Sequence, residues 1–472
     1  MRRQRDESAT VWAQFGDNLL TRWEDLPQAA RARLLFQAHP ERYLAGLSLL
    51  HPALGRVPCR LYPYQLALLR SQGPQRLVVK ARQVGVSQLI AAEALHRARF
   101  FPGSTALFVS RNLAAAQHLQ RLVYQLLESD PAAPVLRRSD SELVLANEST
   151  IRSLPASEST GRTYAATGAY LDEFAHARSA EAIYQAVAPT ASRGGRLLVA
   201  STPRGKANLF YRLYYEATLG LNSFEIHRIH WADCPEYNPQ GYQEPDPAHR
   251  LRLGEQGAWF AQNRDRYSDA AWAEEYECDF AASVGLVYRE FDPSLHVVDY
   301  QYRPEWTTIA GQDFGYIHPA VCLLAQVSPS DDLFVFAEHY QAGVPISTLA
   351  RDHYLPLARE YRVAAWYCDP SDPGAISELR AAGLPALPAR AEVARGLMLV
   401  RKLLRPPGGE APRLHLSRQC RQLSADLATY AYREGSEEPE KGLADHGPDA
   451  LRYLVRSCWA GQAEAEAVAL GP

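Results

Sequence analysis

Residues 76–95, RLVVKARQVGVSQLIAAEAL, combine residue types that bind phosphate with a strand, a polar turn and a helix. Gly85 and Ser87 fit a phosphate-binding loop of the form G-x-x-x-x-G-K-[ST]. Val86 stands where that loop has its lysine, and Lys80 stands where it has its first glycine. Backbone N–H groups at a helix start attract phosphate, Ser87 can place a hydroxyl on Mg²⁺, and Lys80 can reach across the loop. The stretch is either a phosphate-binding loop with a displaced lysine or a plain strand–helix turn.

A pair of carboxylates, Asp172 and Glu173, ends a later apolar strand in YAATGAYLDEFAHA. An aspartate there can hold Mg²⁺ through its water shell, and the adjacent glutamate can polarise a water for attack on the γ-phosphate of ATP. Neighbouring carboxylates are costly unless a cation or solvent is close. A solvated strand end is the alternative, but the preceding loop in the same region favours nucleotide hydrolysis.

Other candidates for this site are weaker when taken singly. Thr202, after Ser201 in RLLVASTPRG, can sense a γ-phosphate or simply leave a strand. In LYPYQLALLR, Tyr64 could stack on a base and Gln65 could bond an adenine edge. Arg162, in SESTGRTYAAT, is a candidate arginine finger for the charge of the transition state. Each is otherwise an ordinary surface residue.

A second acidic set lies in residues 300–460. Asp313 follows a strand in IAGQDFGYIHPA, Asp369 ends another in AAWYCDPSDPGAI, and Asp445 and Asp449 begin a helix in ADHGPDALRYLV. Three such carboxylates can hold two divalent ions about 3.5–4 Å apart for attack on a phosphodiester. Oxygen ligands suit Mg²⁺ or Mn²⁺. Singly, each aspartate is a loop former or helix cap.

The third ligand of that set is open between two aspartates. Asp449 is favoured over Asp445, because it lies one turn into the helix on the face of Tyr453, whereas Asp445 can simply cap the helix. His446 is either a support for the ligands or a structural histidine.

The elements that position these residues form two α/β regions. Apolar strands alternate with helices at 76–81, 87–101, 104–110, 112–129, 142–147, 168–173 and 196–202, which predicts a largely parallel sheet. From Trp306, three consecutive strands, a helix at 346–360 and a strand at 363–370 suit an RNase H-like fold. We expect a helical appendage at 1–50, an ATPase domain at 51–228, a linker or lid at 229–300, with a loop at 233–250, a nuclease domain at 301–462 and a flexible tail at 463–472.

Bulk composition is that of an ordinary globular protein. The 472 residues are 47% hydrophobic and 22% charged, with a formal net charge of −3, which argues neither for nor against nucleic acid. Seven cysteines without C-x-x-C spacing indicate reduced thiols. No apolar run is long enough to cross a bilayer, so we expect a soluble intracellular protein.

Seven motifs in series carry a resemblance to a known family. In order they are YPYQ, KARQVGVS, GRTYAATGAYLDEFAHA, ASTPRG, GQDFG, YCDP and DHGPDALRY, spread over residues 55–460. The sequence resembles the large terminase subunit of tailed bacteriophages, the motor that packages DNA into proheads. The fold that this resemblance implies is a P-loop ATPase domain of the ASCE or RecA-like kind, followed by an RNase H-like nuclease domain.

The resemblance also implies residue roles. Some members carry a deviant Walker A motif with the lysine at its front, which makes Lys80 the phosphate-binding lysine, alone or shared with Arg82. By the same resemblance, Gln65 would sense adenine, Asp172 would be the Walker B aspartate and Glu173 the catalytic carboxylate. Ser201 and Thr202 would form the coupling motif, and Arg162 would be a finger that acts within or between subunits. The implied nuclease ligands are Asp313, Asp369 and Asp449.

The function implied by the resemblance is ATP-driven translocation of double-stranded DNA into the prohead, with cleavage of concatemers at the start and end of packaging. The cofactors are ATP with Mg²⁺ and two Mg²⁺ or Mn²⁺ ions. The partners are DNA, the portal protein, a small terminase subunit and other copies in a ring, with a monomer possible in solution. The expected location is the host cytoplasm, outside the mature virion.

Two other classes compete with this interpretation. A P-loop helicase or DNA-repair ATPase fused to a nuclease would need further helicase motifs and a second RecA-like domain, which the sequence after STPRG lacks. A capsid-associated or DNA-binding structural protein with degenerate motifs would not need Asp172, Glu173 or three separated aspartates.

Overall fold

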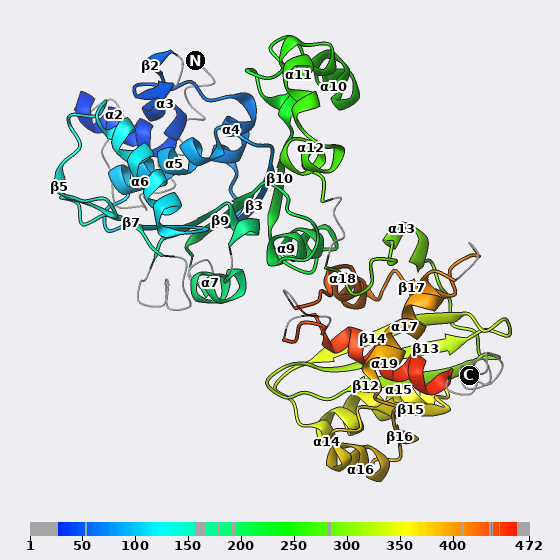
Figure 1. Cartoon of the computed structure of the whole chain (residues 1–472). Helices are drawn as coiled ribbons and strands as arrows, with labels where there is room; N and C mark the ends of the chain where they lie inside the picture. Colours follow the sequence, from blue (N-terminus) through cyan, green and yellow to red (C-terminus); the bar gives the residue numbers. More distant parts are fainter. Residues whose placement is uncertain are drawn as a thin grey trace, which may run out of the picture. The chain divides into compact units, whose positions relative to one another are not determined.

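The computed structural model describes residues 27–51, 54–155, 166–177, 179–189, 194–280, 285–406, 410–433, 436, 438–442 and 444–459. The chain divides into two compact units (Figure 1). The first comprises residues 1–204, 208–217 and 223–281, and the second comprises 205–207, 218–222 and 282–472. Residues 229–281, which include much of the predicted lid, thus group with the first unit. The predicted domain boundaries stay predictions.

The first unit is built on a mixed sheet whose described strands have the order β10-β3-β9-β8-β4-β7-β6-β5. The run from β10 to β7 is parallel, and β6 and β5 continue it antiparallel. The strands are β3 (Gln75–Lys80), β4 (Thr105–Ser110), β5 (Val135–Arg138), β6 (Glu142–Leu145), β7 (Thr150–Ser153), β8 (Gly168–Asp172), β9 (Arg196–Ser201) and β10 (Glu225–Ile229). A separate hairpin pairs β1 (Ser48–His51) with β2 (Gly55–Pro58).

This order places the two predicted motifs at one edge. β3 carries the phosphate loop, β8 carries the acidic pair, and β9 lies between them. Since the three strands are parallel, their carboxyl ends meet at the same edge of the sheet. The predicted class of P-loop ATPase fold is confirmed for this unit.

The central strands form because their sequences are apolar on both faces, as buried parallel strands require. Leu77, Val78 and Val79 of β3 have no exposed surface. Helix α6 (Leu113–Leu127) is capped at its start by Asn112, whose Oδ1 accepts the N–H of Ala115 at 2.9 Å. Helices α5 and α6 pack against each other beside this sheet (Figure 1).

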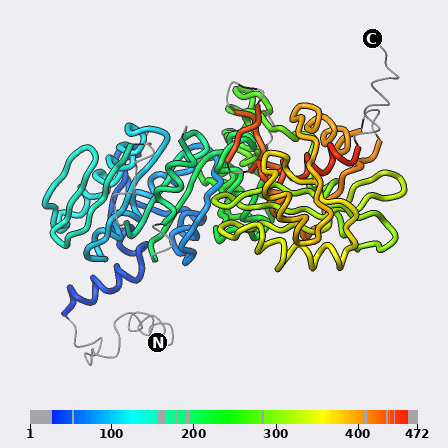
Figure 2. Tube along the Cα trace, turned by 90° about the horizontal axis from the view of Figure 1, so that it is seen from below, coloured from blue at the N-terminus to red at the C-terminus, as the bar shows by residue number. Residues whose placement is uncertain are grey.

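The helices of this unit differ in how deeply they are buried. The first described helix has no buried residue and lies at the margin in Figure 2, whereas the second buries Tyr43 and Leu44 in the core. The helices are α2 (Gln28–Ala38), α3 (Pro40–Leu44), α4 (Pro63–Arg70), α5 (Val86–Phe100), α6 (Leu113–Leu127), α7 (Ala180–Val187), α9 (Leu209–Thr218), α10 (Pro247–Glu255), α11 (Ala258–Asn263) and α12 (Asp269–Glu275), with 3₁₀ turns η2 (Phe174–His176), η3 (Trp231–Asp233) and η4 (Arg264–Arg266).

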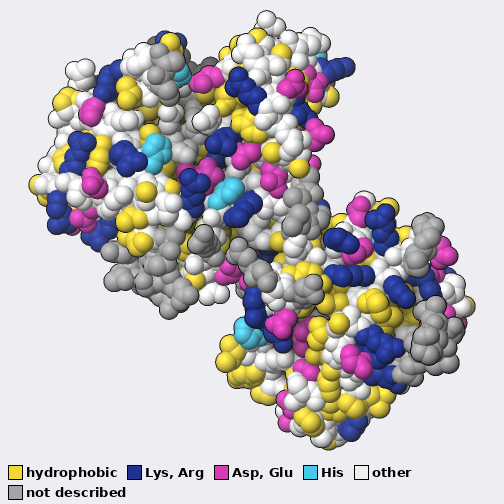
Figure 3. All heavy atoms as spheres, viewed as in Figure 1, with side chains coloured by type: hydrophobic (Ala, Val, Ile, Leu, Met, Phe, Trp, Pro, Cys, Tyr) yellow, Lys and Arg dark blue, Asp and Glu magenta, His cyan; other side chains and the backbone are white. Residues whose placement is uncertain are grey.

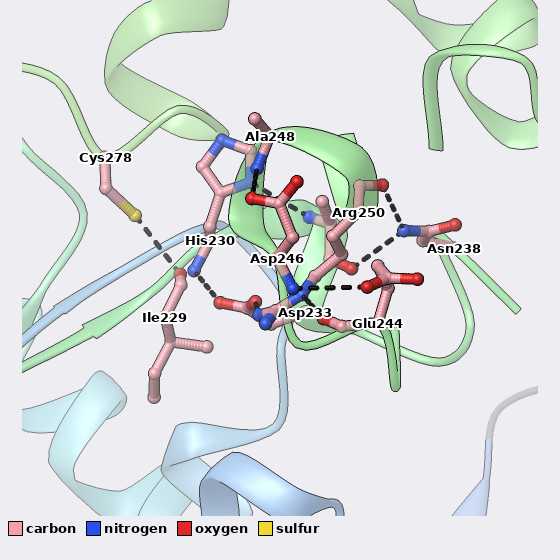
Figure 4. A network of polar contacts seen from close by, with 10 residues as sticks. Ile229, His230, Asp233, Asn238, Glu244, Asp246, Ala248, Arg250 and Cys278 are labelled. Atoms are coloured by element: carbon pink, nitrogen blue, oxygen red, sulfur yellow. Dashed lines mark hydrogen bonds and ion pairs between the residues drawn. The ribbon is translucent and has the colours of Figure 1, made fainter. Parts of the chain in front are cut away.

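Residues 230–277, which we call the helical segment, follow β10 directly. They include η3, turns, and α10 to α12, so the loop expected at 233–250 is helical from Pro247 onward. The segment has its own aromatic core, in which Trp231, Trp259 and Trp272 contact one another. A network of polar contacts around Asp233 and Arg250 fixes its first turns (Figure 4).

One carboxylate joins the polar and aromatic parts of the helical segment. Glu277 accepts the indole N–H groups of Trp231 and Trp272 at 3.0 and 2.7 Å, and His230 Nε2 lies 2.6 Å from it. Burial tends to raise the pKa of Glu277, but the His230 contact and the indole donors outweigh it and lower the pKa to about 2. Glu277 is therefore ionised at neutral pH and holds the segment together.

The second unit has a sheet whose described strands have the order β11-β17-β14-β13-β12-β15-β16. β12, β13 and β14 are consecutive and antiparallel, while β15 joins β12 in parallel. The elements are α13 (Pro293–His296), β11 (Val297–Val298), β12 (Thr307–Asp313), β13 (Ala320–Val327), β14 (Leu333–Gln341), α14 (Ile346–Leu349), the π-helix η5 (Ala350–Tyr354), α15 (Leu355–Glu360), β15 (Ala365–Cys368), α16 (Pro373–Ala381), β16 (Ala386–Pro388), α17 (Val393–Leu404), β17 (Leu414–Ser417), α18 (Arg421–Thr429) and α19 (His446–Cys458).

The predicted RNase H-like arrangement is confirmed by this order, since three antiparallel strands are followed by a helix and by a parallel strand beside the first. Helix α19 then packs on β12. Gly311 makes that contact possible, because a Cβ there would overlap the carbonyl oxygen of Ala450 and approach Leu454 Cβ within 2.9 Å. The close approach brings the start of α19 to the end of β12.

Among the described residues, no helix has the length and apolar character needed to cross a membrane.

Candidate nucleotide site and carboxylate site

Lys80 lies at the carboxyl end of β3, with 5% of its surface exposed. Its Nζ donates to Glu173 Oε1 at 2.9 Å. Burial tends to lower the pKa of Lys80, but the charges of Glu173 and Asp172 outweigh it and raise that pKa. Burial tends to raise the pKa of Glu173, but the Lys80 charge outweighs it and holds that pKa below its usual value. Both groups are therefore charged, and the lysine from the front of the loop faces the acidic pair.

Ser87 and Asp172 are also brought together. Ser87 Oγ donates to Asp172 Oδ2 at 2.6 Å, and Ser110 Oγ donates to the carbonyl of Asp172 at 2.8 Å. Burial raises the pKa of Asp172, with the charge of Glu173 adding to the effect and Lys80 opposing it. A buried carboxylate beside a hydroxyl and a second carboxylate is suited to a divalent cation.

The turn between β3 and α5 is held through its carbonyl groups. Tyr64 donates to the carbonyl of Val84 at 2.8 Å, and Gln65 Nε2 donates to that of Gly85 at 3.0 Å. Gly85 has a φ of 73°, and a Cβ there would approach Gln65 Nε2 within 2.6 Å. Gln65 Oε1 also accepts the N–H of Tyr62 at 2.9 Å. In this structure both ends of the Gln65 amide bond to the protein, and its predicted contact with adenine stays a prediction.

Arg82 faces the helical segment. Its N–H donates to the carbonyl of Glu275 at 2.7 Å, and its half-exposed guanidinium lies 3.5 Å from the Glu275 carboxylate. The Tyr237 hydroxyl lies 3.1 Å from the carbonyl of Arg82 and 3.3 Å from that of Gln83. The sequence analysis did not find Tyr237 or Glu275, because no motif connects residues so far apart in the chain.

The end of β9 lies beside the end of β8. Ser201 Oγ accepts the N–H of Ala175 at 3.1 Å, and Thr202 Oγ1 lies 3.1 Å from His176 Nε2. The candidate coupling residues therefore contact the turn that follows Glu173. Arg162, the candidate finger, lies outside the described residues.

Arg111 is a basic residue that the sequence analysis missed. It follows β4, the strand next to β8, and its charge helps to lower the pKa of Glu173 and of His176. Burial is the main reason why the pKa of His176 is low. The sequence does contain one signal for Arg111, because it follows the carboxyl end of β4, and β4 neighbours β8, the strand that carries Asp172.

The second unit gathers carboxylates where β12, β15 and α19 meet. Asp313, the last residue of β12, has 6% of its surface exposed, and His446 Nδ1 lies 2.8 Å from its Oδ2. Burial raises the pKa of Asp313 to about 6, and the charges of Asp449 and Asp369 add to the effect, although His446 opposes it. Asp449 and Asp369 are therefore both close enough to act electrostatically on Asp313. His446 contacts Asp313 directly.

The other carboxylates of this site bond to neighbouring protein groups. Asp449 Oδ1 accepts two hydrogen bonds from Arg452, at 2.8 and 3.2 Å, and Asp369 accepts the N–H and the hydroxyl of Ser371 at 2.9 and 2.7 Å. Asp445 accepts the N–H of Gly442 at 3.1 Å.

Asp445 precedes α19 without a side-chain bond to that helix. Within the described part of the chain, no group of three or more histidine, cysteine or acidic side chains is arranged to hold a metal. The donors are nonetheless all carboxylate oxygens, the type that Mg²⁺ and Mn²⁺ prefer.

The two units thus combine a fold of the P-loop ATPase class with an RNase H-like fold on one chain. Residues 77–294 match a family model described as the N-terminal part of the large terminase subunit of the T4-like virus type. This match confirms the resemblance to the large terminase subunit of tailed bacteriophages that the motifs indicate. A search among curated proteins finds no relative of the sequence.

Solved structures of similar proteins include three large terminases. The large terminase of bacteriophage HK97 aligns with a TM-score of 0.46 and 14% identity, over 89% of this chain and 99% of its own. That of the thermophilic bacteriophage D6E aligns with a TM-score of 0.38 and 16% identity, over 84% and 98%. The ATPase domain of the Thermus phage P74-26 enzyme aligns with a TM-score of 0.36 and 23% identity, over 47% and 94%.

Proposed function

We propose that the first unit hydrolyses ATP and that Lys80 is its phosphate-binding lysine. The observation that carries this proposal is the ion pair between Lys80 and Glu173 beside the contact of Ser87 with Asp172. A triphosphate with Mg²⁺ needs a cation from the loop and a carboxylate for the metal shell, and both are present. Bound nucleotide would draw Lys80 away from Glu173 and release that carboxylate to orient the attacking water.

The ATPase proposal is tested with Glu173→Gln. The amide keeps the size of the side chain and its hydrogen-bonding capacity but cannot polarise water as a carboxylate does. We expect phosphate release to fall at least 100-fold, while a fluorescent ATP analogue still binds. Phosphate release at the wild-type rate would remove Glu173 from the mechanism.

For the second unit we propose metal-dependent DNA cleavage at Asp313, Asp369 and Asp449. The raised pKa of Asp313 supports this, because burial and, after it, the charges of Asp449 and Asp369 disfavour the ionised carboxylate, and bound cations would relieve both effects. Two Mg²⁺ or Mn²⁺ ions would supply an activated water and stabilise the leaving oxygen. The part of these side chains would be to hold the ions, with His446 orienting Asp313.

Asp313→Asn tests the nuclease proposal on supercoiled plasmid with Mn²⁺. We expect nicking to disappear while ATP hydrolysis stays at the wild-type rate. Equal loss of both activities would contradict two separable sites, and nicking by the variant at the wild-type rate would exclude Asp313 as a ligand.

Together the two activities suit a DNA-packaging motor. We propose that ATP hydrolysis moves double-stranded DNA into a prohead and that the nuclease cuts concatemers. The working form would be a ring of subunits on the portal in the host cytoplasm, directed by a small terminase subunit, with Arg162 as its finger. Figure 3 shows basic side chains among acidic ones on the visible face of each unit, and such basic groups could supply the phosphate contacts that position DNA.

The helicase alternative needs a second RecA-like sheet. In the described residues, the other large sheet has the RNase H-like order instead. A strand-displacement assay separates the two functions, since a packaging motor leaves the duplex paired.

A further inference from the structure

A polar cavity lies in the first unit at the amino ends of the strands, opposite the predicted nucleotide site. Its volume is about 460 Å³, within the range of about 300–1,000 Å³ for small-molecule sites. The ends of α2, α4 and α5, the start of α3 and the first residue of β9 line it. These helices gather on one side of the sheet in Figure 1. None of the motifs assigned above contributes to this cavity.

Two ion pairs account for the acidic side chains of the cavity. Glu93 accepts two hydrogen bonds from Arg76, at 2.9 and 2.6 Å, and both side chains are almost fully buried. Glu41 accepts from Arg70 at 2.6 Å. Each carboxylate of the cavity wall therefore already has its own guanidinium partner.

Two further guanidinium groups of the cavity wall have no such partner in the part of the chain that the structure describes. Arg97 lies over the ring of Phe101 at 5.2 Å, and its Nε is buried without a hydrogen bond. Arg196 likewise has no carboxylate partner among the described residues. Burial lowers the pKa of Arg196, and the positive charges of Arg97 and Arg76 add to this, whereas Glu93 and Tyr170 oppose it. The wall thus holds more positive charge than its carboxylates neutralise.

We propose that this cavity binds a phosphate-type oxyanion through Arg97 and Arg196. Arginine forks match the oxygen geometry of phosphate, and bonds between ionised partners are about twice as strong as neutral ones. An anion would satisfy the buried Arg97 donor and relieve the repulsion on Arg196. The size of the cavity favours a small free phosphate compound over a DNA strand as the source.

Helix α5 gives the cavity a route to the nucleotide site. It begins at Val86, next to the phosphate loop, and ends at Phe100, so Arg97 lies in its last turn. Fifteen residues of helix span about 22 Å. An anion that fixes the far end of α5 would change the freedom of the loop at its other end.

The test is calorimetric titration of inorganic phosphate into the full-length protein with the ATP analogue ATP-γ-S and Mg²⁺ saturating the nucleotide site. We expect binding in the wild type and at least tenfold weaker binding in Arg196→Gln and in Arg97→Gln. The control is Arg121→Gln on α6, an exposed arginine away from the cavity, which should bind like the wild type.

Two further measurements make the test decisive. Because Arg196 has no carboxylate partner, Arg196→Gln should melt in chloride at the wild-type temperature or above it, so its loss of binding is not unfolding. A second titration, with short duplex DNA at matched ionic strength, separates the sources of phosphate. An Arg196-dependent response to phosphate supports the free compound, and one to DNA alone assigns the site to backbone phosphates. Two results would overturn the proposal. One is equal phosphate binding in all variants. The other is no phosphate binding by the wild type combined with no response to DNA that depends on Arg196.

Discussion

Replacement of Lys80 by methionine tests the nucleotide site most directly. Methionine keeps the length and apolar stem of the side chain but removes its charge, and so leaves Glu173 and Asp172 without a cation. Removal of one partner of a buried ion pair costs about 3–5 kcal/mol. Glu173 is 32% exposed, so water compensates in part and the lower end of that range applies. The free energy of unfolding, measured with urea, should therefore fall by about 3 kcal/mol.

The loss of ATP affinity follows from the same charge. A hydrogen bond to a charged group contributes about 1.5–3 kcal/mol, which corresponds to about 10- to 150-fold in the dissociation constant. Titration with a fluorescent ATP analogue and Mg²⁺ measures this change. Glu173→Gln in the Lys80→Met background should restore part of the stability, because the unpaired carboxylate is gone, but should not restore nucleotide binding.

The matched control for Lys80 is Arg82→Met. Arg82 is half-exposed and directed to Glu275, so its loss should change affinity by less than threefold. Wild-type affinity and turnover in Lys80→Met, with a large defect in Arg82→Met, would refute our interpretation of the loop and assign the phosphate to the arginine.

Three more substitutions test how the sites are supported. Glu277 has a pKa of about 2 in the folded protein, below its ordinary 4.5, so its charge stabilises the fold above pH 4.5. This contribution of about 3 kcal/mol is lost as the pH falls toward 2. In Glu277→Gln the free energy of unfolding in urea should therefore change less over that pH range, and a pH profile like that of the wild type would contradict the assignment. Tyr237→Phe removes the hydroxyl that contacts the loop, at about 1 kcal/mol, and should raise the Michaelis constant for ATP about fivefold in steady-state assays; an unchanged constant would make the contact incidental. Gly311→Ala should push α19 away from β12 and lower the free energy of unfolding in urea by about 1–3 kcal/mol. Because Asp449 moves with α19, nicking with Mn²⁺ should be abolished, while ATP hydrolysis persists. Normal nicking would show that the close approach of α19 to β12 is not needed.

The positions of the chemical motifs could be read from the sequence because strand ends fix them. Lys80, Asp172 and Asp313 each end an apolar strand, and parallel neighbours bring such ends to one edge. Val86, at the position where the ordinary loop has its lysine, is buried in the core with 2% exposure, so this apolar residue is accommodated there by packing.

The supports around the motifs could not be predicted in the same way. Tyr237 and Arg111 reach the nucleotide site from elements whose packing no local pattern encodes. Residues 233–250 are rich in proline, glycine and acidic residues, which favours a loop, although α10 begins at Pro247 and the aromatic core of the helical segment is formed by residues far apart in the sequence. The cavity near Arg196 depends on four helices meeting one strand, a long-range arrangement with no periodic signature.

The thiol of Cys278 gives experimenters a built-in reporter. Its Sγ lies 3.1 Å from the carbonyl of Ile229 on β10 (Figure 4) and 3.8 Å from the carbonyl of Val79 on β3. Burial raises its pKa to about 12, so alkylating reagents find almost no thiolate while β10 stays paired with β3. Alkylation of this sulfur, measured on the peptide that contains Cys278, would therefore report any opening between β10 and β3, and it could be compared with and without nucleotide.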